Sequence, residues 1–169
     1  MKAINNVVYQ DYMIKSIRFL FLGLLSWGNV SAQKLPTDYV NPFIGTSNYG
    51  TTNPGAQVPH GLMNVSPFNV MGSSLNNFDK DARWWSTPYE HSNRYFTGFS
   101  HVNLSGVGCP DMGSLLLMPT KGKLEVDYSQ YGSTYKQEVA HPGYYSKVLE
   151  KYGIKTDVAA TAREGVLRS

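Results

Sequence analysis

The stretch "GYYSKVLEKYGIKTDVAAT", residues 143–161, decides the fold class. Two runs typical of strands, 143–150 and 154–161, flank Lys151-Tyr152-Gly153, whose composition is typical of a hairpin turn. In the second run every other residue falls on one face, which is the pattern of a half-buried strand: Ile154, Thr156, Val158 and Ala160. The stretch therefore predicts two adjacent antiparallel strands.

The rest of the chain favours the same class. Residues 114–118 form a continuous apolar run ended by Pro119, the pattern of a buried strand, and residues 123–126 alternate. Residues 38–67 hold four of the nine prolines, which predicts loops with short strands such as 62–65. Nothing after residue 32 predicts a helix of ten residues. We expect an all-β, antiparallel β-sandwich over 33–169, cut short at its C-terminus because such folds usually need about seven strands.

Residues 1–32 are expected to be a signal peptide rather than part of the sandwich. A basic stretch, 13–18, precedes the apolar run 19–25, and small residues stand before Gln33. The apolar run is shorter than the roughly 20 residues that span a bilayer, so no stable membrane anchor is expected. The extra residues ahead of Met13 favour Met13 as the true start. The protein is expected to be exported, to the periplasm or beyond the cell.

Composition excludes some partners. Removing residues 1–32 takes away Lys2, Lys15, Arg18 and Asp11, which lowers the formal net charge from +3 to +1. No basic stripe interleaved with aromatic residues remains, so no nucleic-acid partner is expected. The single cysteine cannot form an internal disulfide. Aromatic residues make up 13% of the chain and charged residues 16%, a balance that favours neutral ligands such as carbohydrates.

The segment "GFSHVNLSGVGCPDMG", residues 98–113, is the first candidate site. His101, Cys109 and Asp111 lack zinc-ligand spacing, and no oxyanion-hole pattern supports Cys109 as a nucleophile, although both alternatives stay open. Gly106 and Gly108 allow backbone conformations that bring the chain close to a ligand. This interpretation makes the segment one wall of a polar pocket.

Trp84 and Trp85 are the second candidate. Adjacent residues of a strand point to opposite faces, so one of the two can stack on a sugar ring while the other packs in the core; packing of both in the core is the alternative. No carboxylate of residues 33–169 stands in a setting that predicts a general acid or base.

Taken together, several short motifs resemble the N-terminal domain of glycoside hydrolase family 92. They are Val40-Asn-Pro-Phe-Ile-Gly-Thr46, Asn53-Pro-Gly-Ala56, Pro59-His-Gly61, Ser66-Pro67, Gly98-Phe-Ser-His101, Leu104-Ser-Gly106, Gly108-Cys109 and Pro142-Gly-Tyr-Tyr145. Each is short, but their order and spacing over residues 38–161 are specific. The sequence departs from the family at Asn53, where an aromatic residue is frequent, and over 82–95.

The resemblance implies a secreted exo-α-mannosidase with a β-sandwich joined to an (α/α)6 barrel. In such enzymes mannose-containing glycans bind between the domains, a Ca2+ ion contacts the sugar, and two carboxylates invert the anomeric centre. Carboxylates and calcium ligands belong to the barrel, so we expect no catalytic or metal-binding residue in this chain, no activity of the chain alone, and the barrel as its partner.

The resemblance also implies which residues line the mannose pocket. Substrate binding is expected of Asn53, Trp84, Trp85, His101 and Asp111, and pocket shaping of Gly55, Gly106, Gly108 and Cys109. The rival interpretation is a stand-alone secreted carbohydrate-binding β-sandwich without catalysis, and a domain whose glycines serve only turns is a third.

Overall fold

The computed structural model describes residues 12–13, 33–48, 50–70, 87–108 and 112–169. Contacts divide the chain into two units, 1–35 and 36–169, and the second unit carries the fold. It begins with a 3-10 helix, η1 (Pro36–Tyr39). Its described residues include one short α-helix, α2 (Tyr128–Tyr131), which Asp127 caps by accepting a hydrogen bond from the Ser129 amide. Among the described residues, no helix is both long and apolar enough to cross a bilayer.

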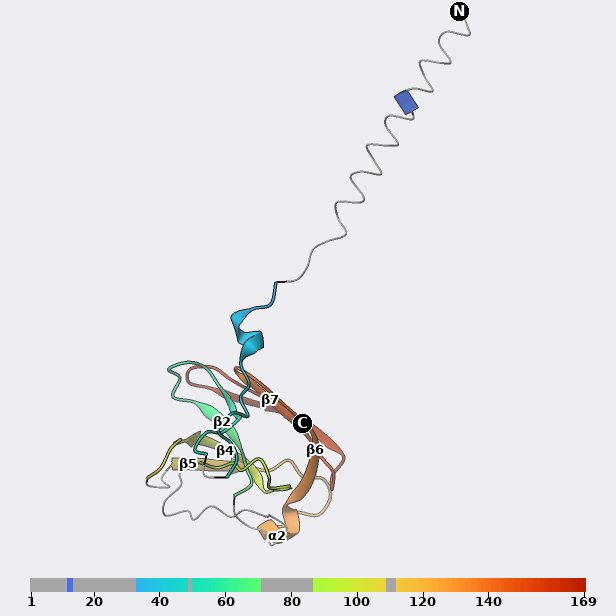
Figure 1. Ribbon diagram of the computed structural model, residues 1–169. Helices are drawn as coiled ribbons and strands as arrows, with labels where there is room; N and C mark the ends of the chain where they lie inside the picture. Colours follow the sequence, from blue (N-terminus) through green and yellow to red (C-terminus); the bar gives the residue numbers. More distant parts are fainter. Residues whose placement is uncertain (1–11, 14–32, 49, 71–86, 109–111) are drawn as a thin grey trace, which may run out of the picture. The chain divides into compact units, whose positions relative to one another are not determined.

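Two antiparallel sheets form the unit (Figure 1), which confirms the predicted β-sandwich. The first sheet has the order β1-β2-β4-β5 and consists of β1 (Ala56–Gln57), β2 (Asn64–Phe68), β4 (Gly98–Asn103) and β5 (Met112–Leu117). The second has the order β3-β6-β7-β8-β9 and consists of β3 (Tyr95–Phe96), β6 (Ser133–His141), β7 (Tyr144–Leu149), β8 (Ile154–Ala160) and β9 (Gly165–Arg168).

The hairpin that decides the fold class is present as predicted. β7 and β8 pair from Tyr144↔Ala159 to Leu149↔Ile154, and Gly153 adopts the positive φ of +64° that the turn requires. Thr156 and Val158 are buried on the predicted face, whereas Lys155 and Ala159 are exposed.

Aromatic rings from both sheets make the core. The Phe99 ring of β4 packs edge-on against Phe96 at 4.8 Å and against Tyr145 of β7 at 6.0 Å between ring centroids. Val65 of β2 and Val158 of β8 belong to the same buried cluster. Phe99 therefore bridges the two sheets.

Two strand expectations are corrected. The run 114–118 does contribute to a strand, β5, but it is not buried: Leu115, Leu116 and Leu117 are 40–50% exposed, so both faces of this edge strand are open to solvent. The alternating segment 123–126 forms no strand, and Leu124 and Val126 lie almost fully in solvent. Alternation predicts an extended chain, but pairing needs a neighbour, and the described residues offer this segment none.

Candidate functional site

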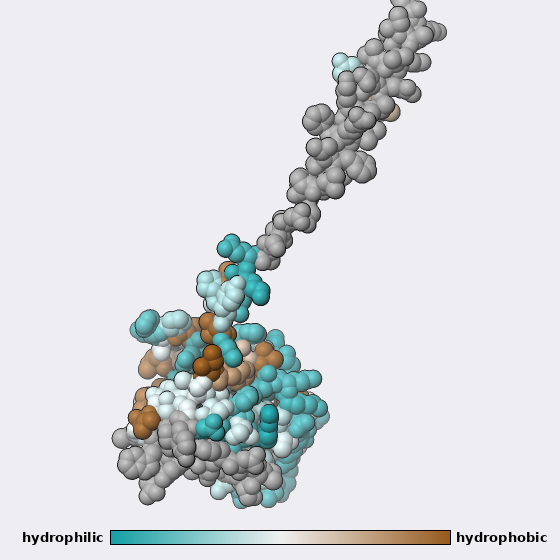
Figure 2. All heavy atoms as spheres, in the orientation of Figure 1, coloured by the Kyte–Doolittle hydropathy of each residue, from teal (hydrophilic) through white to brown (hydrophobic). Residues whose placement is uncertain are grey.

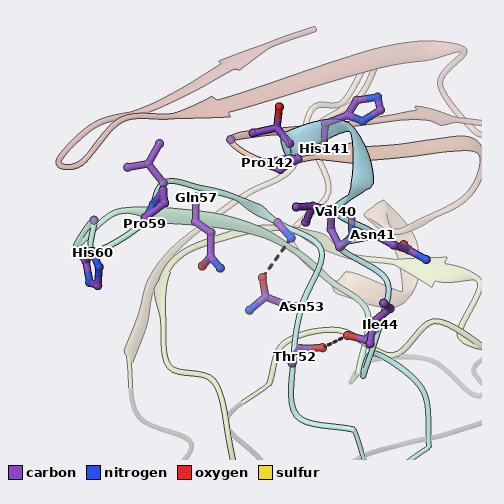
Figure 3. Close-up of a pocket in the computed structure, with 16 residues that line it drawn as sticks. Val40, Asn41, Ile44, Thr52, Asn53, Gln57, Pro59, His60, His141 and Pro142 are labelled. Carbon is purple, nitrogen blue, oxygen red and sulfur yellow. Dashed lines mark hydrogen bonds between the residues drawn. The ribbon is translucent and has the colours of Figure 1, made fainter. Parts of the chain in front are cut away.

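A hollow of about 600 Å³ lies where η1 and the loops after it meet β1 and the β6–β7 turn (Figure 3). Sixteen described residues line it: Thr37, Val40, Asn41, Pro42, Ile44, Thr52, Asn53, Gly55, Gln57, Val58, Pro59, His60, Gly61, His141, Pro142 and Gly143. They come from three separate parts of the sequence, 37–44, 52–61 and 141–143. The fold therefore gathers residues from four of the motifs quoted above around one space.

Local hydrogen bonds fix the loop that carries Asn53. The Asn53 side-chain oxygen accepts from the Gly55 amide at 3.1 Å, an Asx turn, and the Thr52 hydroxyl donates to the Ile44 carbonyl at 2.7 Å. The Asx turn uses the oxygen of the Asn53 amide, so its NH2 group is the part that can donate to a ligand. In Figure 3 the side chains of Asn53 and Gln57 reach into the hollow from neighbouring segments.

Gly55 shapes this loop by its lack of a side chain. A Cβ at Gly55 would lie 2.6 Å from the Val65 carbonyl oxygen and 2.7 Å from the Ser66 Cα, both backbone atoms of β2. Only glycine allows the loop to approach β2 this closely, directly before Ala56 pairs with Val65.

The lining suits a neutral polyhydroxylated ligand. It contains three side-chain amides, Asn41, Asn53 and Gln57, and none of the sixteen residues is Asp, Glu, Lys or Arg. Amides both donate and accept hydrogen bonds, as sugar hydroxyls require. Exposed Val40 and Ile44 supply apolar surface beside them; in Figure 2 brown atoms gather on this part of the unit, whereas the side occupied by β6 is largely teal.

The segment 98–113, predicted to form one wall of a polar pocket, contacts the loop that carries Asn53 at Thr51. The Thr51 carbonyl accepts from the Ser105 hydroxyl at 2.5 Å and from the Gly106 amide at 3.1 Å, which ties the loop after β4 to the residue before Thr52. Gly106 and Gly108 have φ values of +123° and +146°, and a Cβ at either would meet nothing within 4 Å. Their backbone conformation favours glycine, and neither residue lines the hollow.

His101 lies elsewhere. It is buried on β4, where its Nδ1 donates to the Leu115 carbonyl at 3.2 Å, and its ring lies beside Gly165 of β9. The remaining predicted residues, Trp84, Trp85, Cys109 and Asp111, fall outside the described residues. Of the predicted set, the hollow thus brings together Asn53 and Gly55.

Sequence reasoning singled out neither His60 nor His141, both of which line the hollow. A signal was present for His60, which stands between Pro59 and Gly61 in one of the quoted motifs. It adopts φ +59°, a left-handed conformation that is uncommon for residues other than glycine and is often found at functional sites.

Comparison with known proteins agrees with the resemblance. The family model described as "Glycosyl hydrolase family 92 N-terminal domain" matches residues 39–169. The chain therefore belongs to glycoside hydrolase family 92, as part of its N-terminal domain.

Individual relatives point the same way. A family GH92 α-mannosidase from Bacteroides thetaiotaomicron shares 34% identity and a TM-score of 0.65 over 78% of this chain and 18% of its own. The structure of that enzyme in complex with mannoimidazole matches with 35% identity and the same TM-score, over 78% of this chain and 17% of its own. An "Uncharacterized secreted glycosidase" of Arthroderma benhamiae is 30% identical over 73% of this chain. The chain spans 16% of the length of that relative.

Proposed function

We propose that this chain forms the N-terminal wall of the mannose pocket in a secreted, Ca2+-dependent, inverting exo-α-mannosidase acting on terminal α-mannosidic bonds of glycans. One observation carries the proposal: residues from four family motifs, scattered over 37–61 and 141–143, converge on one hollow. A relative's structure contains mannoimidazole, which supports a mannose-type ligand.

The chemistry of the hollow supports a sugar ligand. In this proposal the NH2 group of Asn53 and the amide of Gln57 bind hydroxyls of the terminal mannose, and the apolar surface of Val40 and Ile44 packs against its carbon-bound hydrogens. We keep Asp111, Gly106, Gly108 and Cys109 as proposed parts of a second wall, segment 98–113, whose Gly106 amide donates to the Thr51 carbonyl. Trp84 and Trp85 remain a separate proposed sugar-binding pair. His101 remains a proposed substrate-binding residue of segment 98–113, although its buried ring does not line the hollow.

The chain is proposed to bind and orient the sugar rather than to cleave it. Inversion needs one carboxylic acid to protonate the leaving oxygen and one carboxylate to activate water, about 6.5–9.5 Å apart. No carboxylate is among the described residues that line the hollow. We assign both groups to the remainder of the enzyme, and the chain alone is proposed to be inactive.

Calcium is assigned in the same way. Nowhere in the described part of the chain do three or more His, Cys, Asp or Glu side chains gather into a set that could hold a metal ion. We propose that the calcium ligands lie in the remainder of the enzyme, so no step proposed for this chain passes through the ion.

The exposed leucines of β5 support the proposed partner. Leu115, Leu116 and Leu117 form an edge strand with apolar side chains on both faces, a surface that isolated domains usually cover. We propose that the remainder of the enzyme packs against it. Export through residues 1–32, to the periplasm or outside the cell, completes the proposal; the Arthroderma relative is described as secreted.

The test compares this chain with a protein extended beyond Ser169 along the same reading frame. The extended protein should release mannose from an aryl α-mannoside, lose this activity in EDTA and regain it with Ca2+, while the 169-residue chain releases none. NMR of the first product formed should detect β-mannose. Mannoside binding by the short chain, together with no hydrolysis by the extended one, would instead support the stand-alone carbohydrate-binding module.

A further inference from the structure

A bulge in β6 turns an acidic side chain into the core. The pairing of β6 with β7 shifts register between Lys136 and Val139, and Gln137 within the shift adopts φ +52°. The extra residue reverses the alternation of side chains, so that Glu138 points inward and Val139 outward. Bulges that redirect one side chain in this way are common near functional sites.

The Glu138 carboxylate has three buried neighbours. Tyr89 donates its hydroxyl to the carboxylate at 3.0 Å, Tyr145 donates a second hydrogen bond, and the Lys147 Nζ lies 3.8 Å from Oε1. The side chain of Glu138 is 8% exposed and that of Lys147 is 0% exposed. An acid and an amine therefore meet where almost no water reaches them.

Aromatic rings enclose the amine of Lys147. The Nζ lies 3.4 Å from the ring centroid of Tyr135, 4.2 Å from that of Phe96 and 5.3 Å from that of Tyr145. It makes no hydrogen bond to any described residue. Ring faces and the Glu138 carboxylate stabilise an ammonium, whereas burial without hydrogen bonds opposes one.

These opposing effects bring the two charge states of Lys147 close in free energy. Burial lowers the pKa of Lys147 to about 7; the Glu138 carboxylate works against this and the Arg94 guanidinium adds to it. Burial and the Glu138 charge raise the pKa of the Tyr89 and Tyr145 hydroxyls far above their usual value, and burial also raises the pKa of Tyr135. The tyrosines therefore stay protonated while Lys147 titrates.

Hydrogen bonds connect the Glu138–Lys147 pair and its tyrosines to the segment 40–46, part of which lines the hollow. The Tyr89 oxygen lies 3.0 Å from Nδ1 of His91, and since Tyr89 donates to Glu138 it accepts from His91. The His91 amide donates to the Thr46 carbonyl at 3.0 Å, and its ring lies 5.2 Å from that of Phe43. Both contacts fall in the segment 40–46, four of whose residues line the hollow.

We propose that Glu138 and Lys147 form a proton-sensitive pair in the core. A change in the charge of Lys147 alters the hydrogen bonds of Glu138 and Tyr89, and through His91 it shifts the hollow-lining segment 40–46. With Lys147 charged, Glu138 is shared between the ammonium and the two tyrosines. When Lys147 loses its proton, the carboxylate depends on the tyrosine hydroxyls alone, which strengthens the bond from Tyr89 and shifts its neighbour His91. The proposal does not depend on what the hollow binds.

The test is an NMR titration of the full 169-residue chain labelled with 13C-lysine and 15N, from pH 5.5 to 9.5. The Lys147 Cε signal, assigned by its loss in Lys147→Met, should titrate with a midpoint near 7, far below the ordinary lysine pKa of about 10.4. The amide signals of His91 and Thr46 should move with the same midpoint. A Lys147 signal that stays unchanged up to pH 9.5, or amide signals that do not follow it, would overturn the proposal.

Two variants sharpen the result. Lys136→Met removes an exposed lysine of β6, the strand that carries Glu138, and should leave the His91 and Thr46 titration unchanged. Lys147→Met, on β7, should abolish it. Glu138→Gln removes the charge that favours the ammonium, so the Lys147 midpoint should fall further; a midpoint that stays or rises would contradict the pairing. If Lys147→Met fails to fold, sequential assignment of the wild-type chain and its titration still decide the question.

Discussion

Replacing Gly55 with alanine tests whether the loop that carries Asn53 depends on close contact with β2. The new Cβ would lie 2.6 Å from the Val65 carbonyl oxygen and 2.7 Å from the Ser66 Cα, whereas ordinary contacts at such atoms begin near 3.4 Å. Backbone atoms cannot rotate away, so the loop or the strand must move by several tenths of an ångström. Overpacking of this kind costs about 1–3 kcal/mol.

The measurement is urea unfolding followed by circular dichroism. With a slope of about 1–3 kcal/mol per molar urea, the midpoint should fall by roughly 1 M. The sign of the change in unfolding free energy makes the test decisive. Where a side chain fits, glycine-to-alanine substitution stabilises the protein by about 0.4–1 kcal/mol, because it restricts the unfolded chain. A Gly55→Ala midpoint equal to or above the wild-type value would refute the argument for close approach.

Three further predictions concern the core, the surface and the response to acid. Phe99→Ala, which removes the ring between the sheets, should destabilise by about 3–5 kcal/mol in the same urea assay, while Val139→Ala on the exposed side of β6 should change stability by less than about 1 kcal/mol. Val126→Lys, at a side chain that is 90% exposed, should raise the saturating protein concentration without moving the urea midpoint; a lower midpoint would mean that the side chain is packed. Hydrogen bonds from Arg168 and Tyr144 hold the pKa of Asp157 below its ordinary value of 3.8, so the stability that they add is present above that pH and is lost as the pH falls through the lower folded-state value. The urea midpoint of Asp157→Asn should therefore fall less than that of the wild type between pH 5 and pH 2.5. An equal fall in both proteins would contradict the assignment.

The hairpin of β7 and β8 could be predicted because its evidence is local. A turn with glycine at its last position and alternation over seven residues fix both strands and the buried face of β8. The apolar run 114–118 predicted a strand correctly, but not its exposure, because an apolar run carries no information about whether another layer of the protein covers its faces. Residues 123–126 illustrate the same limit.

The residues of the candidate site likewise fall into two groups, those that the sequence could indicate and those that only the fold brings together. Asn53 and Gly55 could be assigned because they lie in a motif, whereas His141 lines the hollow only because the β6–β7 turn folds back beside 37–61. Lys147 stands on the same face of β7 as Tyr145 and Leu149. Because residues of a strand alternate between its faces, the sequence alone indicates a lysine among core residues at this position. Its partner Glu138 was not readable, since the bulge at Gln137 shifts the alternation of β6 by one residue.

The central claim is that the hollow beside Asn53 binds the terminal mannose of the substrate. The most direct measurement is kcat/KM for an α-mannoside with the extended protein, compared between wild type, Asn53→Ala and the exposed surface control Lys136→Met. Loss of one or two hydrogen bonds to the sugar predicts a fall of about 10- to 100-fold for Asn53→Ala, with Lys136→Met unchanged. An Asn53→Ala enzyme as active as wild type, with an unchanged urea midpoint, would contradict the claim.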